Sequence, residues 1–546
     1  MTNRAKTTGL RYWMLRTLEE CERVSADFSS DPVHDLRVAL RRCRSMADGM
    51  MAIDPDPDWK AMKKSGKQLF QSLGKLRDVQ IMMEWIEKLA LDGSAGVVSQ
   101  QGSDNSKPDS AGRIVRATPG TALLQILKAR EAGHKHEARA ALEEFDRKQW
   151  RHWSKALPVL AMRVRPGSAI FKHLALERWT SARELHSRAL RNRSQVAFHT
   201  LRIGIKRFRY IVENFLPAEH KAWSDDLKHM QDLLGEVHDL DVLWGTAISC
   251  HIFADQESRQ ALHTQILQER TKRIAEYRQR TTNADSLWTV WRAGLPQGKQ
   301  IEAIATQRMK LWAKALDPDF AHSERVARLA LELYDALVTA GLLNFESGTL
   351  AASQNGAGEQ ARASLYLAAL LHDVGKVNGN KGHHKESLEL IKKHGTPLGW
   401  DPQTMTRAAV VARFHCGALP LRSHKTLRDL LPDEQKTIIR LAAVLRLANA
   451  LDFAHDGRVR RVEVENAGPA INSRKQNGFR RKRTALAENQ ALIITAEGYA
   501  DGTATAQAVA AERYLLETVL RRPVILKASA PTRHSASRRS RQPPAA

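Results

Sequence analysis

A duplicated pattern of basic residues is the feature that most restricts how this chain can fold. The stretch His-Asp-Leu-Arg-Val-Ala-Leu-Arg-Arg-Cys-Arg at 34–44 is matched by His-Thr-Leu-Arg-Ile-Gly-Ile-Lys-Arg-Phe-Arg at 199–209. Spacings of three, four and three residues place one histidine and three cations of each copy on one face of an α-helix. These strips contain His34, Arg37, Arg41 and Arg44 in the first copy, and His199, Arg202, Lys206 and Arg209 in the second.

Two such strips indicate an anionic ligand. Like charges three or four residues apart destabilise a helix by roughly 0.2–0.5 kcal/mol per pair, so one strip fits a solvated surface but its repetition favours a binding role. The copies continue in step, because Lys60, Lys67 and 73–78 correspond to Lys221, Lys228 and 234–239. Since internal repeats reflect repeated structural units, we expect a pseudo-twofold helical bundle whose two basic faces line a shared groove.

These blocks resemble the CHAD domain (conserved histidine α-helical domain), a helical module associated with inorganic polyphosphate. The resemblance is strongest at 34–44, 73–79, 199–210 and 234–242. It implies that polyphosphate binds at the repeated positions, which are His34, Arg37, Arg41, Arg44, Lys60, Lys67, His199, Arg202, Lys206, Arg209, Lys221 and Lys228.

Length and charge are consistent with several domains and a polyanionic partner. A chain of 546 residues exceeds what one hydrophobic core usually serves, and a net charge of +25 favours polyphosphate, nucleic acid or anionic lipid. No apolar stretch is long enough for a membrane span, and the four cysteines lack a disulfide or metal spacing. We therefore expect a cytoplasmic protein without membrane contact, with polyphosphate granules as one place where it could accumulate.

Hydrophobic periodicity predicts a mainly α chain with a small α+β segment near its end. A helical period extends through most of the chain and changes to a period of two at 458–465 and 491–497. We expect a helical domain at 8–294 with a disordered insertion at about 92–120, an all-α domain at 301–455, an α+β appendage at 456–528 and a disordered basic tail at 529–546.

Histidine and aspartate residues in the second half favour a metal site. An apolar helix ends in His372-Asp373-Val-Gly-Lys376, and further histidines lie before and after it. Imidazole and carboxylate groups suit zinc, manganese, iron and similar cations. One His-Asp dipeptide is weak evidence, but its order with the other histidines is stronger evidence. In chain order these residues are His322, His372, Asp373, His383, His384 and His415.

This order resembles the HD phosphohydrolase superfamily. Together with the trailing α+β segment, it also resembles the C-terminal region of the exopolyphosphatase and guanosine pentaphosphate phosphatase family, over about residues 305–528. The phosphate-splitting site of that family lies in actin-like domains with glycine-rich loops, which this chain lacks. The resemblance therefore implies that any hydrolysis occurs at the HD residues, with a manganese, zinc, iron or magnesium ion bound by His322, His372, Asp373 and Asp452.

One position departs from the superfamily pattern. Members typically place a last ligating aspartate in an Ala-Asp-x-Leu context, where this chain has Ala448-Asn449-Ala450-Leu451. Asp452 lies near the same helical face and could substitute. Asn449 is the alternative fourth ligand, and as a neutral group it would bind a cation more weakly.

Four residues are candidates for catalysis: Asp373, Lys376, His384 and His415. A bound cation would lower the pKa of water to about 7. Lys376, with Lys385 and Arg413, could hold substrate phosphates, and His384 and His415 could bind a second cation or donate a proton to the leaving oxygen.

The sequence leaves three functions open. In the first, the chain binds polyphosphate and its HD domain hydrolyses, or responds to, condensed phosphates. In the second, the HD site is degenerate and the protein is a non-catalytic scaffold or targeting factor for polyphosphate granules. The third is weak, sequence-independent binding to nucleic-acid phosphates through the basic tail. Single strands bind by stacking on aromatic rings, and the two basic strips carry almost none.

Overall fold

The computed structural model describes residues 9–89, 119–345, 354–465 and 491–529. These residues are mainly α-helical with one three-stranded sheet, as the sequence predicted. The chain divides into two compact units between Arg308 and Met309. None of the described helices combines the length and the apolar composition needed to cross a membrane. The insertion and the tail that were expected to be disordered fall almost wholly outside the described residues.

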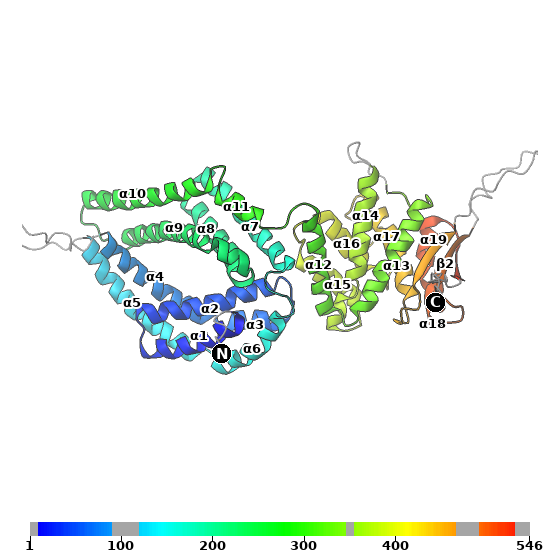
Figure 1. The fold of residues 1–546 in the computed structure, drawn as a ribbon, viewed down its shortest axis with the longest axis horizontal. Helices are drawn as coiled ribbons and strands as arrows, with labels where there is room; N and C mark the ends of the chain where they lie inside the picture. The colour runs from blue at the N-terminus through cyan, green and yellow to red at the C-terminus, as the bar shows by residue number, and fades with distance from the viewer. Residues whose placement is uncertain (1–8, 90–118, 346–353, 466–490, 530–546) are drawn as a thin grey trace, which may run out of the picture. The chain divides into compact units, whose positions relative to one another are not determined.

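The first unit is a bundle of helices (Figure 1). In chain order they are α1 (Leu10–Ala26), α2 (Ser30–Met50), α3 (Pro57–Ser65), α4 (Lys67–Lys88), α5 (Pro119–Glu143), α6 (Arg147–Ala161), α7 (Ala169–Asn192), α8 (Gln195–Phe215), α9 (Pro217–Ser249), α10 (Gln256–Thr281) and α11 (Leu287–Ala293).

The sequence repeat is also a structural repeat. In the first copy α1 packs on α2 and α4 packs on α5; in the second, α7 packs on α8 and α9 packs on α10. The copies differ where α3 and α4, divided at Gly66, stand in place of the single helix α9. Helix α2 contacts α8, and α4 contacts α9. The helices that carry the two basic strips therefore lie side by side (Figure 1).

The contact between α2 and α8 is close because a glycine lies in it. A Cβ added at Gly49 of α2 would collide with the ring of Phe215, which stacks on Phe171 at 4.3 Å between ring centroids. Beside this contact, the Asn214 amide donates to the Ser45 hydroxyl at 2.8 Å. The two copies are thus joined by apolar packing and buried polar contacts, away from the predicted ligand-binding faces.

Helix α12 (Lys299–Leu316) spans the division, and the second unit continues with helices and a small sheet. Its elements are α13 (Phe320–Thr339), α14 (Gln354–Leu371), the short 3-10 helix η2 (Val374–Asn378), α15 (His383–His394), α16 (Pro402–Arg413), α17 (Pro432–Leu451), β1 (Arg461–Glu465), β2 (Leu492–Glu497), α18 (Ala504–Glu512), α19 (Tyr514–Leu520) and β3 (Val524–Ser529).

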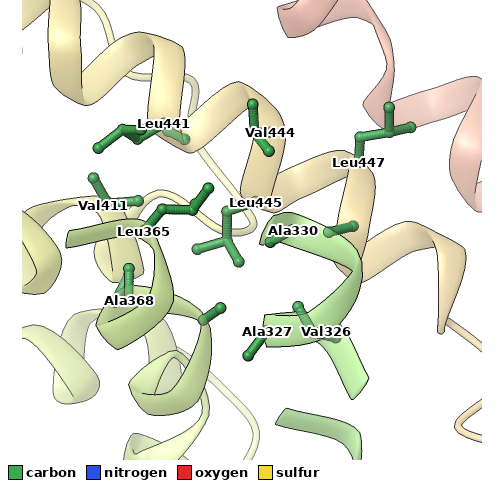
Figure 2. Close-up of a cluster of buried hydrophobic side chains, with 14 of the residues drawn as sticks. Val326, Ala327, Ala330, Leu365, Ala368, Val411, Leu441, Val444, Leu445 and Leu447 are labelled. Carbon is green, nitrogen blue, oxygen red and sulfur yellow. The ribbon is translucent and has the colours of Figure 1, made fainter. Parts of the chain in front are cut away.

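One hydrophobic core holds the second unit together. Figure 2 shows Ala330 of α13, Leu365 and Ala368 of α14, Val411 of α16 and Leu445 of α17 meeting in it. All five side chains are fully or almost fully buried. Because α14, α16 and α17 end close to this core, the polar residues at and just after their C-terminal ends have fixed positions.

The sheet packs against the same core. Strand β2 is central, antiparallel to β1 and parallel to β3, and its alternate residues Leu492, Ile494 and Ala496 are buried in the core. The predicted strands are present. Between β2 and β3 the chain forms two short helices, α18 and α19, which are divided at Arg513.

Replacing Gly49 with alanine should destabilise the first unit, because the added methyl group meets the Phe215 ring. We expect a loss of about 1–3 kcal/mol, typical of overpacking. Gly133→Ala is the matched control, since nothing lies within 4 Å of its added Cβ, and it should stabilise α5 by up to about 1 kcal/mol. Amide hydrogen exchange of peptides from α2 and α8 measures the first effect, and exchange of peptides from α5 measures the second. Unchanged exchange in Gly49→Ala would contradict the packing described.

Candidate functional site

The two basic strips face one groove in the first unit. Arg37 and Arg41 reach it from α2, and Arg202 and Lys206 reach it from α8. Its walls also include residues of α4 and α9, among them Arg77, and its volume is about 500 Å³. Both copies of the repeat therefore contribute cations to a single cavity.

The cations of the groove are held by groups that do not neutralise them. Among the described residues, Arg37, Arg41, Arg202 and Lys206 form no ion pair. The Arg37 guanidinium donates to the Phe70 carbonyl at 3.3 Å. The charged groups of Arg41 and Lys206 both lie over the Tyr210 ring, at 5.6 and 5.8 Å from its centroid. A bound polyanion would supply the missing counter-charge.

The pKa of Lys206 is lowered in this group of neighbouring cations. Burial lowers it to about 8, and the positive charges of Arg202, Arg41 and Arg37 act in the same direction. Two of these arginines belong to the other copy of the repeat. Convergence of the two strips thus has a measurable electrostatic cost, which a polyanion in the groove would remove.

Glycines at matched positions make room for the arginines. A Cβ at Gly74 would lie 2.6 Å from Nη1 of Arg37, and a Cβ at Gly235 would lie 4.0 Å from Nε of Arg202. Gly74 thus lets the Arg37 guanidinium lie close along the facing helix, whereas a Cβ at Gly235 would only be in ordinary contact with Arg202.

Acidic residues also line the groove. Asp78 and Asp239 occupy equivalent positions of the two copies, and burial raises the pKa of both, that of Asp239 to about 6. Neither forms an ion pair with the groove cations among the described residues. Because the folded-state pKa of Asp239 is raised, this carboxyl becomes neutral as pH falls through about 6, and the groove becomes more positive.

Most of the other predicted residues of this site do not line the cavity. Arg44 donates to the Lys63 carbonyl, Arg209 lies 3.7 Å from Glu213, and His199 contacts His238 at 3.3 Å between their Nδ1 atoms. The exposed lysines at the predicted positions do not line the cavity; they are Lys60, Lys67, Lys221 and Lys228. His34 does line it.

Sequence reasoning did not assign a binding role to Arg77 and His238. They are equivalent residues of the repeat, one in each copy, and both line the groove. The aligned pairs Arg77-Asp78 and His238-Asp239 were visible as part of the repeat. Only the pairing of α4 with α9 shows that they face the same cavity as the strips.

In the second unit, Asp373 is the centre of a buried cluster of histidines. The Asp373 carboxylate lies 3.3 Å from His372 Nε2, 3.2 Å from His383 Nε2 and 3.6 Å from His415 Nε2. His322 approaches to 4.0 Å from the first turn of α13, whose N-cap is Asp319. Residues from four segments of the chain thus come together at one carboxylate.

Backbone carbonyls fix which nitrogen each histidine presents. Nδ1 of His372, His383 and His415 lies 2.7–2.8 Å from the carbonyl oxygens of Ala369, Asn380 and Ala412, respectively. Each Nδ1–H therefore donates to a carbonyl three residues earlier and leaves Nε2 as an acceptor. This is how protein ligands of metal ions are commonly oriented.

The cluster leaves acceptors without donors. His383 Nε2 and His415 Nε2 face each other at 3.0 Å, so without a cation one of the two rings must carry a second proton to bridge them. Nε2 of His372 and Oδ1 of Asp373 are buried without a hydrogen bond to any described residue. Buried polar groups are rarely left unpaired, and a divalent cation would satisfy these atoms. The donor atoms form two groups that could hold an ion: His322, His372 and Asp373, and His383, His415 and Cys416.

Charge in the cluster is strongly coupled. Burial alone would raise the pKa of Asp373, but the neighbouring His372 and His383 hold it well below its usual value. The hydrogen bond to Asp373 raises the pKa of His383 to about 10. His383 is therefore protonated at neutral pH without a metal, and binding of a cation would release that proton.

Asn449 and Asp452 occupy different sides of His322. Asn449 Oδ1 lies 2.9 Å from Nε2 of His322, on the side of the cluster. Asp452 accepts from Nδ1 of His322 at 2.7 Å and from Arg325 Nε at 2.9 Å. Asp452 therefore contacts the nitrogen that faces away from Asp373, in contrast to the expectation that it is a ligand. Asn449 stands nearer to that role.

The remaining residues of the motif surround the cluster. Lys376 donates to Asp373 Oδ2 at 2.5 Å. His384 lies outside the ring around Asp373, with Nδ1 at 3.5 Å from Cys416 Sγ, and burial lowers its pKa to about 4. Cys416 was not predicted as a site residue, although its position next to His415 in the sequence was a usable signal.

The glycine of the His-Asp-Val-Gly-Lys motif, Gly375, is required by a close contact between η2 and α15. A Cβ there would lie against the His383 carbonyl and 2.6 Å from the Ser387 backbone nitrogen. The Ser387 hydroxyl donates to the His372 carbonyl at 2.7 Å and accepts from the Gly375 backbone N–H at 2.9 Å. This close approach of η2 to α15 brings His383 to Asp373.

Comparison with known families gives two matches. Residues 14–247 match the family model of the CHAD domain. Residues 306–493 match that of the Ppx/GppA phosphatase, domain III. No curated protein matches the chain. The first match covers the groove, and the second covers the histidine–aspartate cluster.

Variants of the cluster should change metal content in opposite directions. After dialysis against manganese or zinc, the wild type should retain metal, Asp373→Ala should lose it, and Asp452→Asn should bind about 10–100-fold more weakly, because it orients His322. Asn449→Asp should bind more tightly, because it adds a carboxylate beside Nε2. Metal analysis of the purified proteins measures this.

The exposed variant Asp335→Ala is the control, since Asp335 pairs with Arg362 away from the cluster. A wild type that retains no more metal than Asp373→Ala would rule out the metal site.

Proposed function

We propose that this chain, which carries a CHAD domain followed by a domain III of the Ppx/GppA phosphatase type, binds inorganic polyphosphate in the groove and acts on condensed phosphates at the histidine–aspartate cluster. Both domains support an involvement with polyphosphate. The observation that carries the proposal is the convergence of Arg37, Arg41, Arg202 and Lys206 on one cavity without ion-pair partners among the described residues.

Polyphosphate fits this groove better than nucleic acid does. Its charge is dense and uniform, so it can contact cations of both copies at once, and guanidinium groups bind phosphate oxygens in a bidentate manner. Among the described residues, the Phe70 ring lies 5.1 Å from the Arg37 guanidinium and the Tyr210 ring lies 5.6 Å from that of Arg41, and neither ring lines the groove. Stacking of bases is therefore poorly supported.

At the second site we propose an HD-type centre that holds one or two divalent cations. His322, His372 and Asp373 would hold the first, with Asn449 as the fourth ligand, and His383 and His415 would hold the second with Cys416. When bound, such a cation would activate water and offset the charge that develops on phosphoryl oxygens. Asp373 has one oxygen beside His372 and the other beside His383, so it would help to hold a cation in either group.

The chain's own residues have distinct proposed roles. Lys376 balances the charge of Asp373 and lies close enough to contact a phosphate there. His415 is better suited to hold a cation than to donate a proton, because its Nδ1 proton is committed to the Ala412 carbonyl. His384, whose pKa is about 4, is neutral at pH 7 and would bind through an unprotonated nitrogen.

The presence of Asn449 favours one alternative function, that of a non-catalytic polyphosphate scaffold. A neutral amide at the position of a ligating carboxylate weakens cation binding, and a site that binds too weakly would leave a non-catalytic polyphosphate scaffold. In that case the groove would function alone, and the HD fold would only support it.

Removing the groove cations should weaken polyphosphate binding. The quadruple variant Arg37→Ala, Arg41→Ala, Arg202→Ala and Lys206→Ala should bind with lower affinity and show a flatter dependence of log K on log salt, because fewer counterions are exchanged. Titration calorimetry at several salt concentrations measures both quantities. Arg207→Ala is the control, because Arg207 is exposed on the same helix and does not line the groove. Equal salt slopes for the wild type and the quadruple variant would refute groove binding.

Hydrolysis should depend on Asp373. With manganese present, the wild type should release phosphate from polyphosphate, and Asp373→Ala should release it only at the background rate, while still binding polyphosphate in the groove. Phosphate release followed by a colorimetric assay separates the enzyme from the scaffold. Equal background rates for both proteins would support the non-catalytic alternative.

A further inference from the structure

A second anion site is indicated beside the histidine–aspartate cluster. A cavity of about 530 Å³ lies between α15, the end of α16 and the segment at 424–430. It is distinct from the ring of residues around Asp373, none of which lines it. The question is what this cavity can bind.

Arg413 is the residue that makes the cavity unusual. It is the last residue of α16, its exposed fraction is 6%, and it lines the cavity. Its Nη1 is buried and has no hydrogen-bond partner among the described residues. The contact recorded for its guanidinium is with the ring of Phe414, at 5.3 Å. An unpaired buried charge is costly.

The two comparable arginines of this unit are fully paired. Arg407, 7% exposed on the same helix, donates to both oxygens of Glu434 at 2.7 and 2.8 Å. Arg446, 5% exposed, donates to Glu512 at 2.6 Å and to the Phe414 carbonyl at 3.0 Å. The fold thus provides partners for these buried guanidinium groups, and Arg413 is the exception. Its missing partner is best explained by a ligand.

The rest of the cavity wall favours a phosphate group. Lys385, Lys392 and Lys425 surround Arg413 and are exposed. Of the two acidic residues in the wall, Asp429 lies 3.5 Å from Arg428. Four cations therefore face two carboxylates. A guanidinium and mobile ammonium groups around one cavity suit the several oxygens of a phosphate.

The cavity adjoins the cluster along the chain. Lys385 follows His384, whose ring contacts Cys416, and Arg413 precedes His415 by two residues. An anion held here would therefore be bound by Lys385 and Arg413, which are one and two residues from His384 and His415 along the chain.

We propose that this cavity is a phosphate-binding subsite that holds one phosphate group of a condensed phosphate while another group lies at the cluster. The identity of the ligand as a substrate rests on the proposed hydrolase function, whereas binding of an anion to Arg413 does not. A subsite next to the reacting group would select condensed phosphates over single phosphates. It also accounts for the cost of an unpaired buried guanidinium.

Lysine footprinting tests the subsite directly. The full-length protein in EDTA is treated with an acetylating reagent, with and without tripolyphosphate, and acetylation is quantified by mass spectrometry. Tripolyphosphate should slow acetylation of Lys385, Lys392 and Lys425 several-fold in the wild type, and should not do so in Arg413→Met. Lys393, the neighbour of Lys392 that does not line the cavity, is the internal control and should be acetylated at one rate throughout.

Each outcome bears on the proposal. Unprotected lysines in the wild type would overturn it, and equal protection in Arg413→Met would overturn the role of Arg413. Should Arg413→Met not fold, Arg413→Lys keeps the charge and should reduce the protection. Orthophosphate in a parallel arm should protect less than tripolyphosphate; equal protection would overturn the preference for condensed phosphates.

Phosphate release separates this proposal from the proposed function. If the cluster hydrolyses polyphosphate, Arg413→Met should raise KM for tripolyphosphate about tenfold or more, as expected for loss of a charged contact, with a smaller change in kcat. If wild type and Asp373→Ala both show background rates while footprinting still protects the three lysines, hydrolysis is ruled out and the subsite stands. If KM is unchanged in an active Arg413→Met enzyme, the subsite is ruled out and hydrolysis stands.

Discussion

The burial of several cations beside one another in the groove is the constraint around which the first unit is built. In the groove, Lys206 loses its proton at a pH of about 8 because it is buried beside Arg202, Arg41 and Arg37. Repulsion between these neighbouring cations opposes folding. Selection for stability would therefore remove them unless they had a function. The close contact of α2 and α8 through Gly49 and Phe215 provides the packing that holds these charges together.

The same physical pattern recurs in the second unit with different chemistry. There the buried acceptors without a hydrogen bond to a described residue are Nε2 of His372 and Oδ1 of Asp373, and Nη1 of Arg413 is an unpaired donor in the same unit. A cation would satisfy the acceptors, and an anion would satisfy the arginine. Condensed phosphates bind divalent cations as well as arginine, so one class of ligand accounts for all three arrangements.

The sequence predicted the secondary structure and the repeated bundle because both depend on the periodicity of hydrophobic and charged residues. The repeat, the helical period and the change to a period of two predicted the bundle and the small sheet, and the strips predicted which faces of α2 and α8 carry charge. Long-range contacts could not be predicted in this way. Arg77 and His238 line the groove because α4 packs against α9. Arg44 and Arg209 do not line it, because Arg44 contacts the Lys63 carbonyl and Arg209 contacts Glu213.

The second site shows the same limit at finer scale. The order of histidines predicted a cluster, but the hydrogen bonds of His322 decide that Asp452 faces away from Asp373 and Asn449 faces it. Which of the two residues contacts each nitrogen of His322 depends on the backbone conformation at the end of α17. The sequence spacing alone does not specify that conformation. Cys416 likewise becomes a candidate ligand only because α15 brings His383 and His384 to it.

A double-mutant cycle across the repeat tests the central claim most directly. Affinity for polyphosphate is measured by calorimetry for the wild type, Arg37→Ala, Arg202→Ala and the double variant. If one anion contacts both copies in a shared groove, the two losses should not add, with an interaction energy above about 0.5 kcal/mol. Additive losses would mean that the two strips bind independently, and the account of a shared groove would be wrong.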